Sequence, residues 1–273
     1  MITHNGKQYK VGKETKYSTS MDSGAFSRSA VNIIIPFHGQ YKKVTELVES
    51  ILQSVRSNPY QLCLVDDASP NDEFIKTFSD LVPATDRYKS QIVTFRNEER
   101  IGFGASLKVG FDMTDAPWVL FIHSDCLVED PKFMIEMGRS LLTLKDKGVR
   151  MVSARSNNPG DYHKSLKGIK NEATSDYILN DETLPLYCMM CHRELFSHIG
   201  GFIKPYPISY YEDEELAHRV RKYGYKQAVC GNAWVRHFGG STVGDICKRE
   251  PEAKGIIENN RNLCIQDLKS LNG

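Results

Sequence analysis

Short apolar runs alternate with amphipathic stretches through the first half of the chain. Four apolar runs have the length of buried strands: 31–35, 60–65, 91–95 and 118–122. The intervening residues carry apolar side chains at helical spacing, which predicts helices near 40–56, 71–82 and 103–114. Strands that alternate with helices in this way are typical of an α/β fold with a mostly parallel sheet.

The second half of the chain has a different rhythm. Its pattern predicts further helices at 131–147, 192–199 and from 210 to Gly224, and further strands at 150–154 and 186–191. Residues 155–183 are polar and lack a strong period, so we expect a long substrate loop there. We expect this loop, together with residues 206–211, to influence the choice of substrate, because loops vary most in such folds.

Three segments are predicted along the chain. Residues 1–30 are polar and form an appendage, in which Asn5-Gly6 can turn a small hairpin. Residues 31–242 form the main domain, and residues 243–273 form a helical tail. No internal repeat is visible in the sequence.

Composition narrows the class of protein. Hydrophobic residues make up 40% and charged residues 25% of the 273 residues, as in an ordinary globular enzyme. The net charge of +1 gives no bulk attraction to nucleic acid. We expect a cytoplasmic protein, because no apolar run is long enough to cross a bilayer and the amino terminus lacks the apolar core of a signal peptide. The seven cysteines are scattered and odd in number, so we expect reduced thiols.

Polar groups follow three of the predicted strands. Asp125 follows 118–122, Asp66 and Asp67 follow 60–65, and Pro36-Phe37-His38 follows 31–35. Open α/β sheets bind ligands outside the carboxyl ends of their strands. These strand ends therefore predict a nucleotide site, with Asp125 as the first candidate for a metal ligand.

The order of these motifs resembles glycosyltransferase family 2. The resemblance covers residues 31 to 242 and rests on these ordered elements: Ile33-Ile-Ile-Pro36, Val65-Asp-Asp-Ala-Ser69, Arg96-Asn97 with Gly102 and Gly104, His123-Ser-Asp125, Gly200-Gly-Phe202, Glu212-Asp213 with Leu216 and Arg219, Gly224-Tyr225, and His237. It implies a GT-A fold, the fold of nucleotide-diphospho-sugar transferases, with helices on both faces of the sheet.

The resemblance also implies a donor and a metal. The donor would be a nucleoside-diphosphate sugar, and Mn²⁺ or Mg²⁺ would stabilise the charge of the departing diphosphate. Asp125 matches the last acid of the family's Asp-x-Asp motif, and His237 matches a histidine that completes metal or diphosphate binding in many members. Both are therefore expected to bind the metal.

Further donor contacts follow from the same resemblance. Asp67 would accept a hydrogen bond from the nucleobase, and Asp66 would help to shape its pocket. Pro36 and Phe37 would line the base or ribose pocket. Gly102 belongs to the same expected donor-binding set.

The resemblance implies a single displacement at the anomeric carbon, with inversion. Asp213 matches the family's general base, which takes the proton from the acceptor hydroxyl of a glycan or another hydroxyl-bearing molecule. One departure stands out, because His123 replaces the first acid of Asp-x-Asp. This change puts the donor contacts of His123 and Ser124, and with them the nucleotide preference, in doubt.

Simpler roles remain open for each of these residues. Asp66 and Asp67 can cap the turn that follows their strand, and His237 can be an ordinary surface histidine. The acids at 212–215 suit a helix start, so the match alone singles out Asp213.

Two other functions also remain open. One is a nucleotide- or glycan-binding module that has lost turnover, and the other is a sugar-phosphate nucleotidyltransferase. The second is disfavoured because residues 36–41 lack its Gly-rich phosphate loop. The sequence leaves the sugar, the nucleobase, the acceptor and the oligomeric state undetermined.

Overall fold

The structure is a computed structural model that describes residues 2–4, 7–9, 30–55, 59–70, 92–159, 167–168, 170 and 173–272. Strands β1 (Ile2–His4) and β2 (Lys7–Tyr9) pair antiparallel, which confirms the predicted strand pair of the hairpin. The helix predicted near 71–82 lies outside the described residues.

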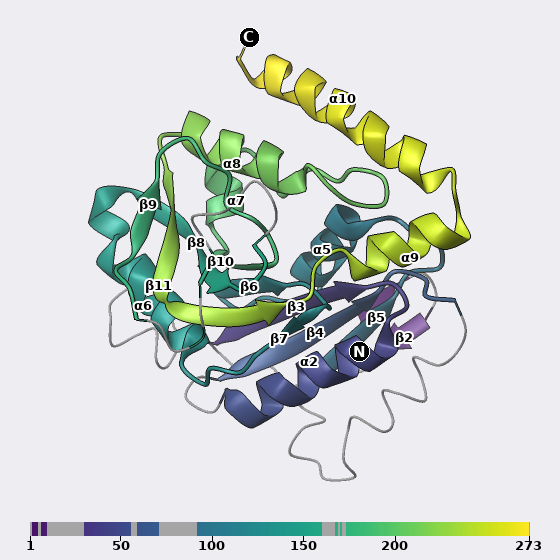
Figure 1. The fold of residues 1–273 in the computed structure, drawn as a ribbon, viewed down its shortest axis with the longest axis horizontal. Helices are drawn as coiled ribbons and strands as arrows, with labels where there is room; N and C mark the ends of the chain where they lie inside the picture. The colour runs from purple at the N-terminus through teal and green to yellow at the C-terminus, as the bar shows by residue number, and fades with distance from the viewer. Residues whose placement is uncertain are drawn as a thin grey trace.

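A nine-stranded sheet runs through the rest of the described chain (Figure 1). Its strands are β3 (Val31–Phe37), β4 (Tyr60–Asp66), β5 (Ile92–Arg96), β6 (Trp118–Ile122), β7 (Cys126–Leu127), β8 (Val149–Ser156), β9 (Tyr177–Leu179), β10 (Cys188–His192) and β11 (Lys226–His237). Strands β5, β4, β3 and β6 are parallel neighbours, and so are β8 and β11. Strand β10 lies between β6 and β8, antiparallel to both. The expectation of a mostly parallel sheet in an α/β fold is confirmed.

Helices cover both faces of this sheet (Figure 1). The helices are α2 (Tyr41–Ser54), α5 (Phe103–Asp112), α6 (Phe133–Thr143), α7 (Leu195–His198), α8 (Glu212–Lys222), α9 (Ser241–Arg249) and α10 (Ala253–Asn272). Helices α5, α7 and α8 lie on one face of the sheet, and α2 and α6 lie on the other. The core sits between these layers, and β3 is buried along its whole length.

Close packing of α5 on the sheet depends on a glycine. A Cβ at Gly110 would lie 2.5 Å from Cγ2 of Ile34 and 3.3 Å from Sγ of Cys63. Only a residue without a side chain therefore lets this helix approach β3 and β4 so closely. The approach matters for the site, because the N-terminus of α5 lies beside the end of β4.

Several element predictions were wrong in detail. The helix predicted at 131–147 ends at Thr143 and is followed by a separate 3-10 turn, Lys145–Lys147. His192 belongs to β10, and α7 begins only at Leu195. The sequence reading missed β7, β9 and the long strand β11, which carries His237 at its end.

Candidate metal and donor site

Three of the candidate residues converge at the carboxyl end of β6. His123, Asp125 and His237 each offer a ligand atom, and these atoms lie within 4.8 Å of one another. Nε2 of His237 is 3.3 Å from Oδ1 of Asp125, and Nδ1 of His123 is 3.9 Å from the same oxygen. The structure thus brings the predicted metal pair together and adds His123 to it. A ligand role for His123 was missed, although its spacing of two residues from Asp125 on one turn was visible in the sequence.

Strand pairing explains how residues so far apart in sequence meet. His123 and Asp125 lie in the turn between β6 and β7, where the N–H of Cys126 donates to the carbonyl of His123 (3.1 Å). Strand β7 pairs with the end of β11, placing His237 opposite Cys126. The N–H of Phe238 then donates to the carbonyl of Asp125 (3.0 Å).

An irregularity in β11 makes this second pairing possible. The register with β8 shifts between Cys230 and Trp234, and the strand curves toward β7 beyond that point (Figure 1). A bulge bends a strand and increases its twist. The far end of β11 therefore leaves the line of β8 and reaches the turn that carries Asp125.

Neighbouring groups set the orientation of His237 and the neutral state of His123, so both imidazoles can serve as metal ligands. Nδ1 of His237 lies 2.7 Å from the carbonyl of Asn158, which can only accept, so Nδ1 carries the proton and Nε2 presents its lone pair. Tyr187 stacks on the His237 ring and fixes its plane. Burial, and next the neighbouring His237, lower the pKa of His123 to about 4, so its ring is neutral at pH 7.

Two buried imidazole nitrogens fit a role as cation ligands. Nε2 of both His123 and His237 is buried without a hydrogen-bond partner among the described residues. Buried polar atoms are normally satisfied, and an unpaired one calls for an explanation. Two imidazoles and a carboxylate form a donor set that suits a divalent ion such as Mn²⁺.

The predicted base-binding acids have other partners in the structure. The Asp67 carboxylate accepts from Nδ2 of Asn97 (2.9 Å) and from the N–H groups of Ile101 (2.8 Å) and Gly102 (2.8 Å). It therefore ties the end of β4 to the start of α5.

Asp66 is held equally firmly. Its carboxylate accepts from the N–H of Ser69 (2.8 Å) and from Nη1 of Arg96 (2.5 Å). Contacts of Asp66, Asp67 and Gly102 with a nucleotide stay predictions, alongside these structural roles.

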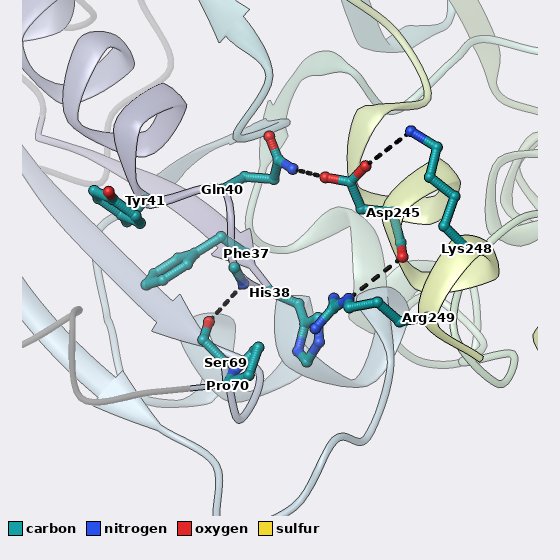
Figure 2. A pocket seen from close by; sticks show the side chains of 10 residues that line it. Phe37, His38, Gln40, Tyr41, Ser69, Pro70, Asp245, Lys248 and Arg249 are labelled. Atoms are coloured by element: carbon teal, nitrogen blue, oxygen red, sulfur yellow. Dashed lines mark hydrogen bonds and ion pairs between the residues drawn. The ribbon is translucent and has the colours of Figure 1, made fainter.

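A cavity of about 300 Å³ opens beyond the end of β3. Figure 2 shows Phe37, His38, Ser69 and Pro70 on one side of it, facing side chains of α9 on the other. Lys248 and Arg249 line the α9 side, and sequence reasoning assigned nothing to them. Phe37 lines this cavity, whereas Pro36 is buried in β3 and is absent from the lining residues; the nucleoside contacts expected of both stay predictions. Ser124 is buried in the turn before Asp125.

The acids at the start of α8 differ in their surroundings. Glu215 forms a buried ion pair with Arg219 (2.8 Å), so its role is structural. Glu214 is exposed. Asp213 is half-buried, and desolvation raises the pKa of its carboxyl to about 6. Glu212 is almost fully buried, and desolvation raises the pKa of its carboxyl to about 8.

Known proteins share both the sequence pattern and the fold. Residues 32–137, less than half of the chain, match glycosyl transferase family 2. A comparison with curated proteins gave no match. Among solved structures, the chain is similar to the mannosyltransferase PcManGT from Pyrobaculum calidifontis in complex with GDP-Man and Mn²⁺, with 16% identity, a TM-score of 0.59, and coverage of 94% of this chain and 77% of that one.

Two further structures show the same similarity over part of their length. GalNAc-T7, solved with UDP, GalNAc and Mn²⁺, gives 14% identity and a TM-score of 0.58 over 77% of this chain. S. aureus TarS 1-349 gives 15% identity and a TM-score of 0.55 over 76% of this chain. The chain spans 43% of the GalNAc-T7 chain and 60% of the TarS chain.

The fold and the matched segment define the class of this protein: the described chain has the GT-A fold of nucleotide-diphospho-sugar transferases. Its resemblance to family 2 is confirmed over residues 32–137. Within the described ranges, no helix is both long and apolar enough to cross a membrane.

Proposed function

We propose that this protein transfers a sugar from a nucleoside-diphosphate donor to an acceptor hydroxyl, with inversion and with the help of a divalent cation. The observation that carries the proposal is the cluster of His123, Asp125 and His237 at the carboxyl edge of the sheet. Carboxyl edges of parallel strands are where such folds bind ligands. Two of its residues lie on the turn that follows β6, and His237 lies at the end of β11.

The cation set consists of His123, Asp125 and His237. A bound divalent ion would neutralise charge on the diphosphate as it leaves. The imidazoles favour Mn²⁺ over Mg²⁺, because Mg²⁺ prefers carboxylate and water oxygens. Asn158 fixes the tautomer of His237, and Tyr187 fixes its ring plane, so the ligand lone pair is oriented before the ion arrives.

The nucleoside of the donor would occupy the cavity beyond β3. The ring of Phe37 offers an apolar face to a base or ribose, and His38 is held in place by a hydrogen bond to the carbonyl of Asp67 (2.7 Å). Lys248 and Arg249 place two positive charges on the opposite wall, where the carboxylate of Asp245 lies 3.5 Å from Nζ of Lys248 (Figure 2). An aromatic face beside two cations suits a nucleoside phosphate.

Asp213 is proposed as the general base. A base near neutral pH works best with a pKa close to the working pH, and desolvation raises the pKa of this carboxyl to about 6. Asp213 would take the proton from the acceptor hydroxyl as that oxygen attacks the anomeric carbon. A single base and a single displacement give inversion.

Thermal shift against UDP-, GDP-, dTDP- and CMP-sugars, with Mn²⁺ or with EDTA, tests donor binding. We expect a rise in melting temperature for one donor with Mn²⁺, and its loss in Asp125→Ala. The exposed Asp146 provides a matched control, because Asp146→Ala removes an acid far from the cluster in sequence. A donor shift that is equal with Mn²⁺ and EDTA, and unchanged in Asp125→Ala, would remove the cation from the proposal.

Turnover with the donor identified in this way tests the reaction itself. Release of the nucleoside diphosphate should be fast in the wild type and at least about a hundredfold slower in Asp213→Asn. NMR of the first-formed product should show an inverted anomeric centre. Retention would refute the single-displacement mechanism, whereas binding without turnover would favour the nucleotide-binding module.

A further inference from the structure

The segment that leads into α8 has an unusual backbone. Three of its residues have positive φ although none is glycine: Ile208 (67°), Tyr210 (82°) and Tyr211 (76°). Such conformations cost on the order of 1–3 kcal/mol each and persist only where the surroundings impose them. A β-branched residue such as Ile208 is an especially poor choice for this region. Residues 206–211, called here the strained segment, must therefore be held by strong contacts.

Helix α5 holds the inner side of the strained segment. The N–H of Phe103 donates to the carbonyl of Ile208 (2.8 Å). Gly102 lies so close that a Cβ would be 3.0 Å from the nitrogen of Ile208. The inner side thus contacts the same turn that Asp67 ties to β4.

Helix α10 holds the outer side. Nδ2 of Asn260 donates to the carbonyls of both Pro207 (2.8 Å) and Ser209 (2.9 Å). Asp267 accepts from the hydroxyl of Tyr206 (2.8 Å) and from Nζ of Lys204 (2.5 Å). Figure 1 shows α10 running along the edge of the molecule next to α8. These contacts come from a helix far beyond residues 32–137.

Asparagine at position 260 is unfavourable for the stability of the fold. The residue is fully buried, and its Oδ1 has no hydrogen-bond partner among the described residues. An unpaired buried acceptor costs about 1–3 kcal/mol. What the side chain gains is the pair of hydrogen bonds from Nδ2, and both go to the strained segment.

The strained segment leads directly into the first turn of α8, which carries Asp213. Tyr210 is 46% exposed. Desolvation raises the pKa of its phenol, and after Cys247 the negative charges of Asp125 and Asp213 raise it further. Asp213 follows two residues after Tyr211, in the first turn of α8.

From this arrangement we infer that Asn260 is a positioning residue for the transfer step. It acts through the strained segment, whose conformation sets the start of α8 and with it the position of Asp213, and it leaves donor binding unaffected. The inference rests on the proposed function, because it gives a purpose to the placement of Asp213. Helix α10 thereby contributes to the transfer step by holding the strained segment, although it contributes no ligand to the site.

Asn260→Leu tests this inference, since leucine has a similar size and removes both hydrogen bonds. Asn259→Leu is the matched control, because Asn259 is the exposed neighbour on the same helix. Two measurements apply to both variants: Mn²⁺-dependent release of nucleoside diphosphate from the donor identified above, and amide hydrogen exchange over residues 206–213. We expect at least tenfold lower kcat in Asn260→Leu, a donor dissociation constant within twofold of the wild type, and faster exchange confined to 206–213. Asn259→Leu should match the wild type.

Three outcomes would overturn the inference. The first is a kcat for Asn260→Leu within twofold of Asn259→Leu. The second is a parallel loss of donor binding, melting temperature and kcat, which indicates a general structural role. The third is equal hydrogen exchange over 206–213 in the two variants, which would show that Asn260 does not hold the segment. This measurement needs no turnover, so it tests the inference even if the wild type turns over none of the donors and the proposed function itself fails.

Discussion

The pH dependence of turnover gives a direct test of Asp213. Burial raises the pKa of this carboxyl from its usual 3.8 to about 6. At pH 5 about a tenth of the molecules would then carry the ionised base, against about nine tenths at pH 7. We therefore expect kcat to be roughly tenfold lower at pH 5 than at pH 7. An unshifted carboxyl would be almost fully ionised at both values and would leave kcat unchanged.

Loss of the cation at low pH must be separated from protonation of the base. The pKa of His123 is lowered to about 4, mainly by burial, so this candidate ligand stays neutral at pH 5. Initial rates of nucleoside diphosphate release should be measured from pH 4.5 to 8 with saturating donor and Mn²⁺. Calorimetry at each pH then shows whether the donor is still bound.

A flat profile would contradict this reasoning. If kcat at pH 5 stays within twofold of its value at pH 7 while the donor is bound, Asp213 is not a base with a raised pKa. Asp213→Asn supplies the control, because its residual rate should have no inflection near pH 6. An inflection that persists in this variant would point to another group.

Three further predictions concern stability. In Asp67→Ala, the N–H donors of Asn97, Ile101 and Gly102 lose their acceptor, so urea denaturation should show a loss of at least about 3 kcal/mol; an isostable variant would contradict the structural role of this carboxylate. In Gly231→Ala, the new Cβ would lie 2.1 Å from the carbonyl oxygen of Thr174, so the melting temperature should fall by an amount that corresponds to about 1–3 kcal/mol. Gly244→Ala is the control, because its new Cβ meets no atom within 4 Å and should cause no such clash. Glu212 binds its proton more tightly in the folded chain, where its pKa is about 8, than in the unfolded chain, so its contribution to stability is present at low pH and is lost as the pH rises toward 8. Glu212→Gln should therefore unfold at higher urea concentration than the wild type at pH 8, with a smaller difference at pH 5; a difference that does not grow with pH would argue against a buried neutral carboxyl.

The first half of the fold was predictable because local pattern and tertiary structure agree there. The apolar run 118–122 coincides with β6, and 31–35 and 60–65 fall within β3 and β4. Strand β11 was missed because its polar residues, Lys226, Gln227 and Arg236, interrupt the apolar pattern, and its position depends on pairing with β8. Register between distant strands is invisible in a local window.

Part of the site was also predictable. Asp125 follows a buried strand, and the resemblance to family 2 added His237, which the structure places 3.3 Å from it. His123 lies beside Asp125 through a single turn, whereas the place of His237 depends on the pairing of β7 with β11, which no single segment encodes. No feature of the sequence pointed to Asn260, because the sequence alone does not distinguish a buried asparagine on a helix from the exposed Asn259 beside it.

The pairing of β7 with β11 has a consequence for the order of folding. Asp125 and His237 are separated by the strands β8 to β11 and by α6 to α8, and only docking of the end of β11 brings them together. Closing so long a loop is slow and costs chain entropy. If these residues bind a cation as proposed, the ion would find its complete set of ligands only late in refolding, after β11 has docked. The time at which Mn²⁺ binds during refolding would then report when the end of β11 docks, which is the last long-range step of assembly.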